Sequence, residues 1–408
     1  MKRYFILFFS SLFFFTSCEK QEKSIVKDPI ELTIEQKQLV SSSNKFGFNV
    51  FKEIAGNAKE GENVFISPLS MSFALTMLYN GAETATKQEL KDALGYSGLT
   101  DDQVNIANRD LIKALIEIDP KVVMEIANSI WYKNDFNVES DFLTINNSYF
   151  NAEVKKTDFS PATVGMINNW VSSNTHDKIK KIIDEIPAET VMYLINAIYF
   201  KGTWKYQFEN KNTTKLDFFP STGSTFKTDF MVQEGAFEIV KNDLFSGINL
   251  PYGNENYSMM VLLPNEGKSV ENIISSMNDE NWTQWVNKLQ VTNKIKIYLP
   301  KFKFSYEKKL NDDLNALGMQ TMFSDFADLT RISKAGGIKV SEVKHKTFVE
   351  VNEEGTEAAA VTSIGIELTS AGPNNIFNAN KPFVFIIKEK DTNSLLFLGI
   401  MNKPTIEN

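Results

Sequence analysis

The sequence predicts one large domain of the α+β class. Segments with helical spacing of apolar residues dominate the first part of the chain, whereas segments with strand patterns become frequent after Val122. The two kinds of segment are partly segregated, without the regular alternation that a doubly wound sheet requires. No repeat or low-complexity block interrupts residues 36–403, so we expect residues 36–408 to form a single domain.

The predicted helices combine helical spacing with recognisable ends. The spacing predicts a first helix over residues 37–55. Ser67 is a suitable N-cap and Pro68 fits a first turn, so a second helix should begin there, and Gly81 can close it. Further helices are expected over residues 86–94, 103–116, 164–175, 270–277 and 310–317.

The predicted strands are short apolar or alternating segments bounded by turn residues. The clearest of them span residues 122–131, 191–200, 248–251, 257–263, 295–299, 339–351 and 383–387. Composition is sufficient for a large core, because 42% of the residues are hydrophobic and 23% are charged.

One further segment alternates like a strand with one buried face. Its even-numbered positions carry no charge and grade from small to bulky, whereas its odd-numbered positions include two glutamates. The even positions are Thr356, Ala358, Ala360, Thr362, Ile364, Ile366 and Leu368. A potentially buried strand within a long loop indicates a conformational switch. A helix that begins at Thr356 is the alternative, although the long alternation and Gly355 favour the strand.

The first residues have the pattern of an export signal. Lys2 and Arg3 precede an apolar run that is too short to span a bilayer comfortably, and small residues precede Cys18. Cys18 is the only cysteine and stands where a bacterial lipoprotein carries its lipid; a chance cysteine is the alternative. We therefore expect residues 1–17 to be a signal peptide and residues 18–35 a lipidated flexible tether. The protein would be anchored to the bacterial outer membrane, on its surface or its periplasmic face.

Charge and motifs argue against several functions. Removal of residues 1–17 lowers the number of basic residues from 43 to 41 against 51 acidic ones, a net charge of about −10, which disfavours nucleic-acid binding. The chain has two histidines and none of the common catalytic motifs. Ser67 and His345 could pair, but no third member is evident. We expect no enzymatic activity, no cofactor, no metal site and a monomeric protein.

Five motifs, in order along residues 36–405, resemble those of the serpin family. They are residues 63–70 with Gly81 and Ala82, residues 196–204, residues 323–329, the segment that begins at Glu353, and residues 377–383. The resemblance is strongest to bacterial lipoprotein serpins. It implies the serpin fold, with three β-sheets, eight or nine helices and an exposed reactive-centre loop at about residues 353–376.

The resemblance also implies an inhibitor that traps proteases irreversibly. A serine protease would attack the loop and form an acyl-enzyme, and the hinge would then insert into the main sheet as a new strand. The hinge comprises Glu353, Glu354, Gly355, Thr356, Glu357, Ala358, Ala359, Ala360, Val361 and Thr362. From Thr356 onward its even positions are uncharged and can enter the core without burying charge, which favours inhibition. The alternative is a non-inhibitory serpin that acts as a surface binding lipoprotein.

The length of the hinge in the family places the reactive bond at Thr369–Ser370, and a shift of one residue gives Leu368–Thr369. Leu368 suits proteases of the chymotrypsin, cathepsin G or subtilisin type, whereas Thr369 suits an elastase-type pocket. A papain-type cysteine protease would read Leu368 and cut after Thr369. Residues 363–370 contain no Arg or Lys, which argues against trypsin-like targets.

Two polar clusters follow from the resemblance. Ser67, Ser70, Asn196 and His345 would form a shutter beneath the opening sheet, where hydrogen bonds can be exchanged as strands part. A satisfied core histidine is a compatible interpretation of His345. Trp204, Glu353 and Lys301 would lie where the hinge enters, with an ion pair between Glu353 and Lys301. His176 receives no role.

Overall fold

The computed structural model describes residues 29–356 and 375–407. The expected signal peptide and most of the expected tether lie outside these residues, as do the hinge beyond Thr356 and both candidate reactive bonds. Within the described residues, no helix is long and apolar enough to cross a membrane.

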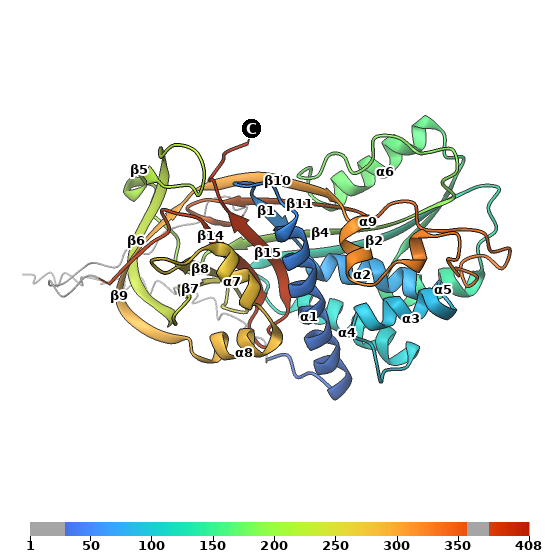
Figure 1. The fold of residues 1–408 in the computed structure, drawn as a ribbon, viewed down its shortest axis with the longest axis horizontal. Coiled ribbons are helices and arrows are strands. Elements are labelled where there is room, and N and C mark those ends of the chain that lie inside the picture. The colour runs from blue at the N-terminus through green and yellow to red at the C-terminus, as the bar shows by residue number, and fades with distance from the viewer. Residues whose placement is uncertain (1–28, 357–374, 408) are drawn as a thin grey trace, which may run out of the picture.

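α2 begins at the cap that we predicted, whereas α1 begins three residues before the predicted start. α1 (Ile34–Gly56) is preceded by Thr33, which forms a capping box with Gln36. α2 (Pro68–Tyr79) is capped by Ser67, whose hydroxyl accepts the backbone N–H of Ser70. The remaining helices are α3 (Thr84–Ala93), α4 (Asp101–Glu117), α5 (Ser140–Phe150), α6 (Pro161–Asn174), α7 (Val270–Ser276), α8 (Asp279–Asn287) and α9 (Asn311–Ala316). The described part of the chain therefore contains nine α-helices (Figure 1).

Gly81 does not close α2 as we predicted. The helix ends at Tyr79, and the role of Gly81 is to leave space. A Cβ on Gly81 would lie 2.3 Å from a side-chain carbon of Ile332 and 2.9 Å from the ring of Phe142. Close packing, rather than a left-handed turn, therefore requires glycine at this position.

The strands form two sheets by hydrogen bonding. The six-stranded sheet has the order β10 (Phe302–Lys309), β11 (Lys344–Val351), β12 (Gly355–Thr356), β4 (Met192–Thr203), β2 (Val122–Lys133) and β3 (Glu153–Thr157). The nine-stranded sheet has the order β1 (Val64–Ile66), β15 (Leu395–Met401), β14 (Phe383–Glu389), β8 (Tyr257–Pro264), β7 (Phe245–Tyr252), β6 (Phe226–Lys241), β9 (Gln290–Pro300) and β13 (Asn375–Asn378), with β5 (Thr214–Phe218) also paired to β6.

β6 divides the nine-stranded sheet into two blocks. Its last four residues pair with β7, whereas most of its length pairs with β9 across an irregularity between Gly235 and Phe237. The two blocks and the six-stranded sheet together give the three-sheet arrangement that we expected. The α+β class is confirmed, because six of the nine described helices precede β4, whereas most of the strands follow it in the chain. Figure 1 shows α2, α3 and α5 together at one end of the molecule, with α7 and α8 beside the nine-stranded sheet.

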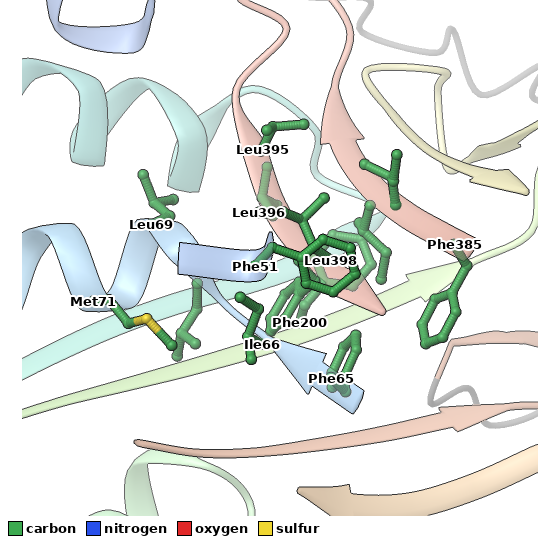
Figure 2. Close-up of a cluster of buried hydrophobic side chains, with 14 of the residues drawn as sticks. Phe51, Phe65, Ile66, Leu69, Met71, Phe200, Phe385, Leu395, Leu396 and Leu398 are labelled. Atoms are coloured by element: carbon green, nitrogen blue, oxygen red, sulfur yellow. The ribbon is translucent and has the colours of Figure 1, made fainter. Parts of the chain in front are cut away.

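The main core lies between the two sheets and the first helices. Phe65 of β1 stacks on Phe385 of β14 and on Phe397 of β15, with ring centroids 5.5 and 5.0 Å apart. Figure 2 shows Phe65, Phe200 and Leu398 in this cluster, together with side chains from α1 and α2. A second cluster packs α6 and the segment after it on the opposite face of the six-stranded sheet. Both faces of that sheet are therefore covered.

Candidate functional site

A short strand joins β4 to β11 at one end of the six-stranded sheet. In β12, Thr356 pairs with Val351 of β11 and with Gly202 of β4, and Gly355 pairs with Thr203. Within the described residues, the ladder order connects β4 and β11 only through this two-residue strand. We call the line between β4 and β11 the seam.

A cavity of about 390 Å³ lies along the far part of the seam. Residues 189–196 form one wall, residues 337–346 form the other, and α2 contributes Ser70, Ala74 and Leu78. Its lining is mostly apolar. The segment 339–343, which we predicted as part of a strand, forms this wall without strand pairing, because β11 begins only at Lys344.

The hinge enters the seam at Gly355 and Thr356. Gly355 has a φ of +156°, and a Cβ on it would lie 2.0 Å from the carbonyl oxygen of Gly202, so only glycine permits this approach. Thr356 is 4% exposed, and its hydroxyl lies 2.5 Å from the hydroxyl of Tyr252. Thr356, where the uncharged even-numbered positions begin, therefore faces the core, as the alternation predicts.

Trp204 holds the backbone of the hinge. Its indole N–H donates to the carbonyl oxygen of Asn352 at 2.9 Å. Its backbone N–H donates to the carbonyl oxygen of Glu354 at 2.8 Å. Its ring stacks on Tyr252, with centroids 4.4 Å apart and an interplanar angle of 10°. The predicted position of Trp204 at the entry of the hinge agrees with this geometry.

The predicted ion pair between Glu353 and Lys301 is present. Lys301 Nζ lies 2.8 Å from one carboxylate oxygen of Glu353, and the hydroxyl of Thr213 donates to the other oxygen at 2.7 Å. Glu353 as a whole is 5% exposed. Burial alone would raise the pKa of Glu353, but the hydrogen bonds from Lys301 and Thr213 outweigh burial and lower it. The buried carboxylate is therefore ionised and paired at neutral pH.

The four predicted shutter residues are in contact beneath the seam. The backbone N–H of Ser67 donates to Nε2 of His345 at 3.1 Å, and the Ser67 hydroxyl donates to the carbonyl oxygen of Leu396 at 2.8 Å. The backbone N–H of Ser70 donates to the Ser67 hydroxyl, and the Ser70 hydroxyl donates to Oδ1 of Asn196. The cluster thus links α2 to β4 on one side of the seam and to β11 on the other.

Asn128 extends this network and was not among the predicted residues. The side-chain amide of Asn196 donates to Oδ1 of Asn128 at 2.7 Å, and the amide of Asn128 donates to the carbonyl oxygen of Phe150 at 2.7 Å. Asn128 is 2% exposed. The available signal was an amide side chain near the middle of a predicted strand, because such a side chain needs partners where it is buried.

His345 is neutral in the folded protein. Burial lowers the pKa of its imidazole to about 3. A backbone N–H can only donate, so the bond from Ser67 requires an unprotonated Nε2 and leaves the ring proton on Nδ1. The shutter network therefore holds together by neutral hydrogen bonds.

His176 joins α6 to the six-stranded sheet. Its Nε2 lies 3.0 Å from a carboxylate oxygen of Glu125 on β2, and its ring centroid lies 4.3 Å from that of Tyr199 on β4. These contacts hold the segment that follows α6 against β2 and β4 of the six-stranded sheet.

The remaining predicted site residues lie outside the described residues. They are Glu357, Ala358, Ala359, Ala360, Val361, Thr362, Leu368, Thr369, Ser370 and Cys18. Within residues 29–356 and 375–407, no group of three or more His, Cys, Asp or Glu side chains could hold a metal ion.

The fold and the site together define an α+β protein with a partly filled strand position in its six-stranded sheet. Among the described residues, only β12 occupies this position between β4 and β11, and it does so at one end. The family model "Serpin (serine protease inhibitor)" matches residues 41–404. The chain belongs to the serpin family, and the resemblance inferred from its motifs is confirmed.

Relatives and solved structures agree with this assignment. The chain is 34% identical to Iripin-2 of Ixodes ricinus over 381 residues, which cover 90% of this chain and 94% of Iripin-2. The structure is similar to that of the thermophilic serpin tengpin in its native state, with a TM-score of 0.83, 34% identity and coverage of 92% and 96% of the two chains. It is also similar to the structure of human thyroxine-binding globulin, with a TM-score of 0.83, 28% identity and coverage of 91% and 100%.

Proposed function

We propose that this protein is an irreversible protease inhibitor. The target cleaves the reactive-centre loop and remains attached to it as an acyl-enzyme, while the hinge inserts between β4 and β11 and distorts the trapped protease. The observation that carries the proposal is the position of Thr356, which is buried in the seam and paired with both neighbouring strands. Insertion would continue a strand that has already begun.

The register of β12 supports this proposal. Gly355 pairs with Thr203, and Thr356 pairs with Gly202 and Val351. If the same antiparallel register continues, Thr362 will lie opposite Asn196 on β4 and opposite His345 on β11. A threonine hydroxyl would then enter the neutral shutter network at the place where its hydrogen bonds must be exchanged.

The sizes of the inserting side chains also match the seam. In the continued register, Ala358 would face the buried Phe200 and Val349, where little space remains for a large side chain. Ile364 and Ile366 would reach the cavity of about 390 Å³. Burial of Ile364 and Ile366 would contribute on the order of 3–6 kcal/mol before entropy is counted. The gradient from small to bulky residues thus follows the shape of the cavity.

We propose Leu368 or Thr369 as the primary specificity residue. Leu368 would direct the inhibitor to chymotrypsin-, cathepsin G- or subtilisin-type proteases, and Thr369 to elastase-type proteases; papain-type proteases remain candidates for cleavage after Thr369. We further propose that a lipid on Cys18 anchors the protein to the outer membrane, so that it acts close to the cell surface.

Mixing the protein with chymotrypsin and with neutrophil elastase tests this function. We expect an SDS-resistant complex and a C-terminal peptide, whose mass identifies the cleaved bond. Thr369→Asp and Leu368→Asp serve as a matched pair, because a carboxylate fits neither an apolar nor a small pocket, so only the variant of the residue that fills the pocket should lose most of its association rate. Cleavage without a complex across serine and cysteine proteases would refute inhibition and favour the alternative, a non-inhibitory binding lipoprotein.

A further inference from the structure

We propose that Tyr252 is a positioning residue that fixes the insertion register by holding Thr356 in the seam before any protease acts. The inference rests on the proposed inhibitory function. Tyr252 is the last residue of β7 and belongs to the nine-stranded sheet, whereas Thr356 belongs to the six-stranded sheet. Their hydroxyls lie 2.5 Å apart, and both residues are buried. This bond ties the first inserted side chain to the other sheet.

The ring of Tyr252 is held on several sides. It stacks on Trp204 at 4.4 Å and meets the ring of Phe200 edge-on at 5.4 Å. A Cβ on Gly202 would lie 2.8 Å from the Tyr252 ring, so the glycine leaves room for it. The ring cannot turn away without displacing these neighbours, and its hydroxyl therefore occupies a fixed point beneath the seam.

Thr356 is the only residue of β12 with a side chain that can form a specific contact, because the other residue of this strand is Gly355. A slip of one residue in a strand exchanges its two faces and would turn every even-numbered hinge residue away from the core. Within the described residues, Thr356 is the one hydrogen-bond partner of the Tyr252 hydroxyl. Burial raises the pKa of Tyr252, so the phenol stays neutral. The pair therefore distinguishes the correct register from the slipped one.

This bond need not break during inhibition. The residues that would enter the seam after cleavage follow Thr356 in the chain, and Thr356 keeps its partners on β4 and β11. Insertion therefore starts from a strand end that is already in register. Loss of the bond should slow this start and give water more time to hydrolyse the acyl-enzyme, so that more inhibitor is consumed for each protease trapped.

Tyr252→Phe and Thr356→Val each remove one hydroxyl and retain the shape of the side chain. Each variant leaves the other hydroxyl buried without a partner, whereas the double variant leaves none. We expect each single variant to raise the ratio of hydrolysis to trapping by about two- to tenfold, and the double variant to raise it no further. Tyr306→Phe removes a buried phenol from β10 of the six-stranded sheet, away from Thr356, and should leave the ratio unchanged.

Hydrogen exchange of the free protein provides a second measurement. Amides of residues 352–356 should exchange faster in Tyr252→Phe and Thr356→Val than in the wild type or in Tyr306→Phe. A wild-type protein that traps protease while Tyr252→Phe shows the same ratio and the same exchange would overturn the positioning role alone. A wild-type protein that traps no protease would overturn the proposed function. If the amide exchange of Tyr252→Phe were also unchanged, the inference that Tyr252 holds Thr356 in the seam would be overturned as well.

Discussion

Lowering the pH from 7 to 5 should destabilise the folded protein by about 2 kcal/mol through His345 alone. Burial lowers the pKa of His345 to about 3, against 6.5 for an exposed imidazole. Below pH 6.5 the unfolded chain binds a proton that the folded protein does not bind until about pH 3. Stability therefore falls with pH across this interval, by about 1.4 kcal/mol per pH unit.

His345→Gln isolates this contribution. The glutamine oxygen can accept the backbone N–H of Ser67 in place of Nε2, but the side chain does not titrate. Urea unfolding followed by tryptophan fluorescence should show a larger loss of stability for the wild type than for the variant between pH 7 and 5, with a difference of about 2 kcal/mol. Between pH 8 and 7 the two proteins should respond nearly equally. Equal losses down to pH 5 would refute the assignment of a buried neutral imidazole.

Three further substitutions test the entry of the hinge. Thr356→Arg places a charge on the buried face and should convert the inhibitor into a substrate; unchanged complex formation on a denaturing gel would mean that the inserting face is wrong. Gly355→Ala brings a Cβ to 2.0 Å from the Gly202 carbonyl and should release the hinge, measured as faster amide exchange of residues 352–356, whereas wild-type exchange would contradict the close approach. Lys301→Met leaves the Glu353 carboxylate without its cation and should cost about 1–3 kcal/mol in urea unfolding at pH 7. Because pairing lowers the pKa of Glu353, that stabilisation is present above the ordinary value of 4.5 and is lost as the pH falls through the lowered value; a cost that persists in acid would exclude the ion pair as its source.

The sequence predicted elements whose pattern stays constant along their length. β8 and β14 are continuous apolar runs, and α2 has a clear cap and a proline in its first turn. β6 escaped prediction because it pairs with β7 at one end and with β9 along most of its length, so its alternation changes phase near Gly235. α5 escaped because it buries only a few of its side chains, which leaves a weak apolar stripe.

The site was predictable where motifs mark it and not where distant segments meet. Glu353, Lys301 and Trp204 followed from the family resemblance, and their contacts agree with it. Thr213 directly precedes β5 and Tyr252 ends β7, and neither segment carries a local sign of a role at the hinge. Only the packing of one sheet on the other brings them to residues 353 and 356.

The order in which the strands are synthesised has a consequence for folding. β14 and β15 are among the last segments of the chain, yet they lie between β1 and β8 within the nine-stranded sheet. Val64 of β1 pairs with Ile400 of β15, so almost the whole chain must be synthesised before the first strand can pair. Until then, β1 and β8 present unpaired apolar edges of the kind that promote aggregation. We therefore expect nascent chains that stop before residue 401 to require chaperones, and folding to be completed only after synthesis ends.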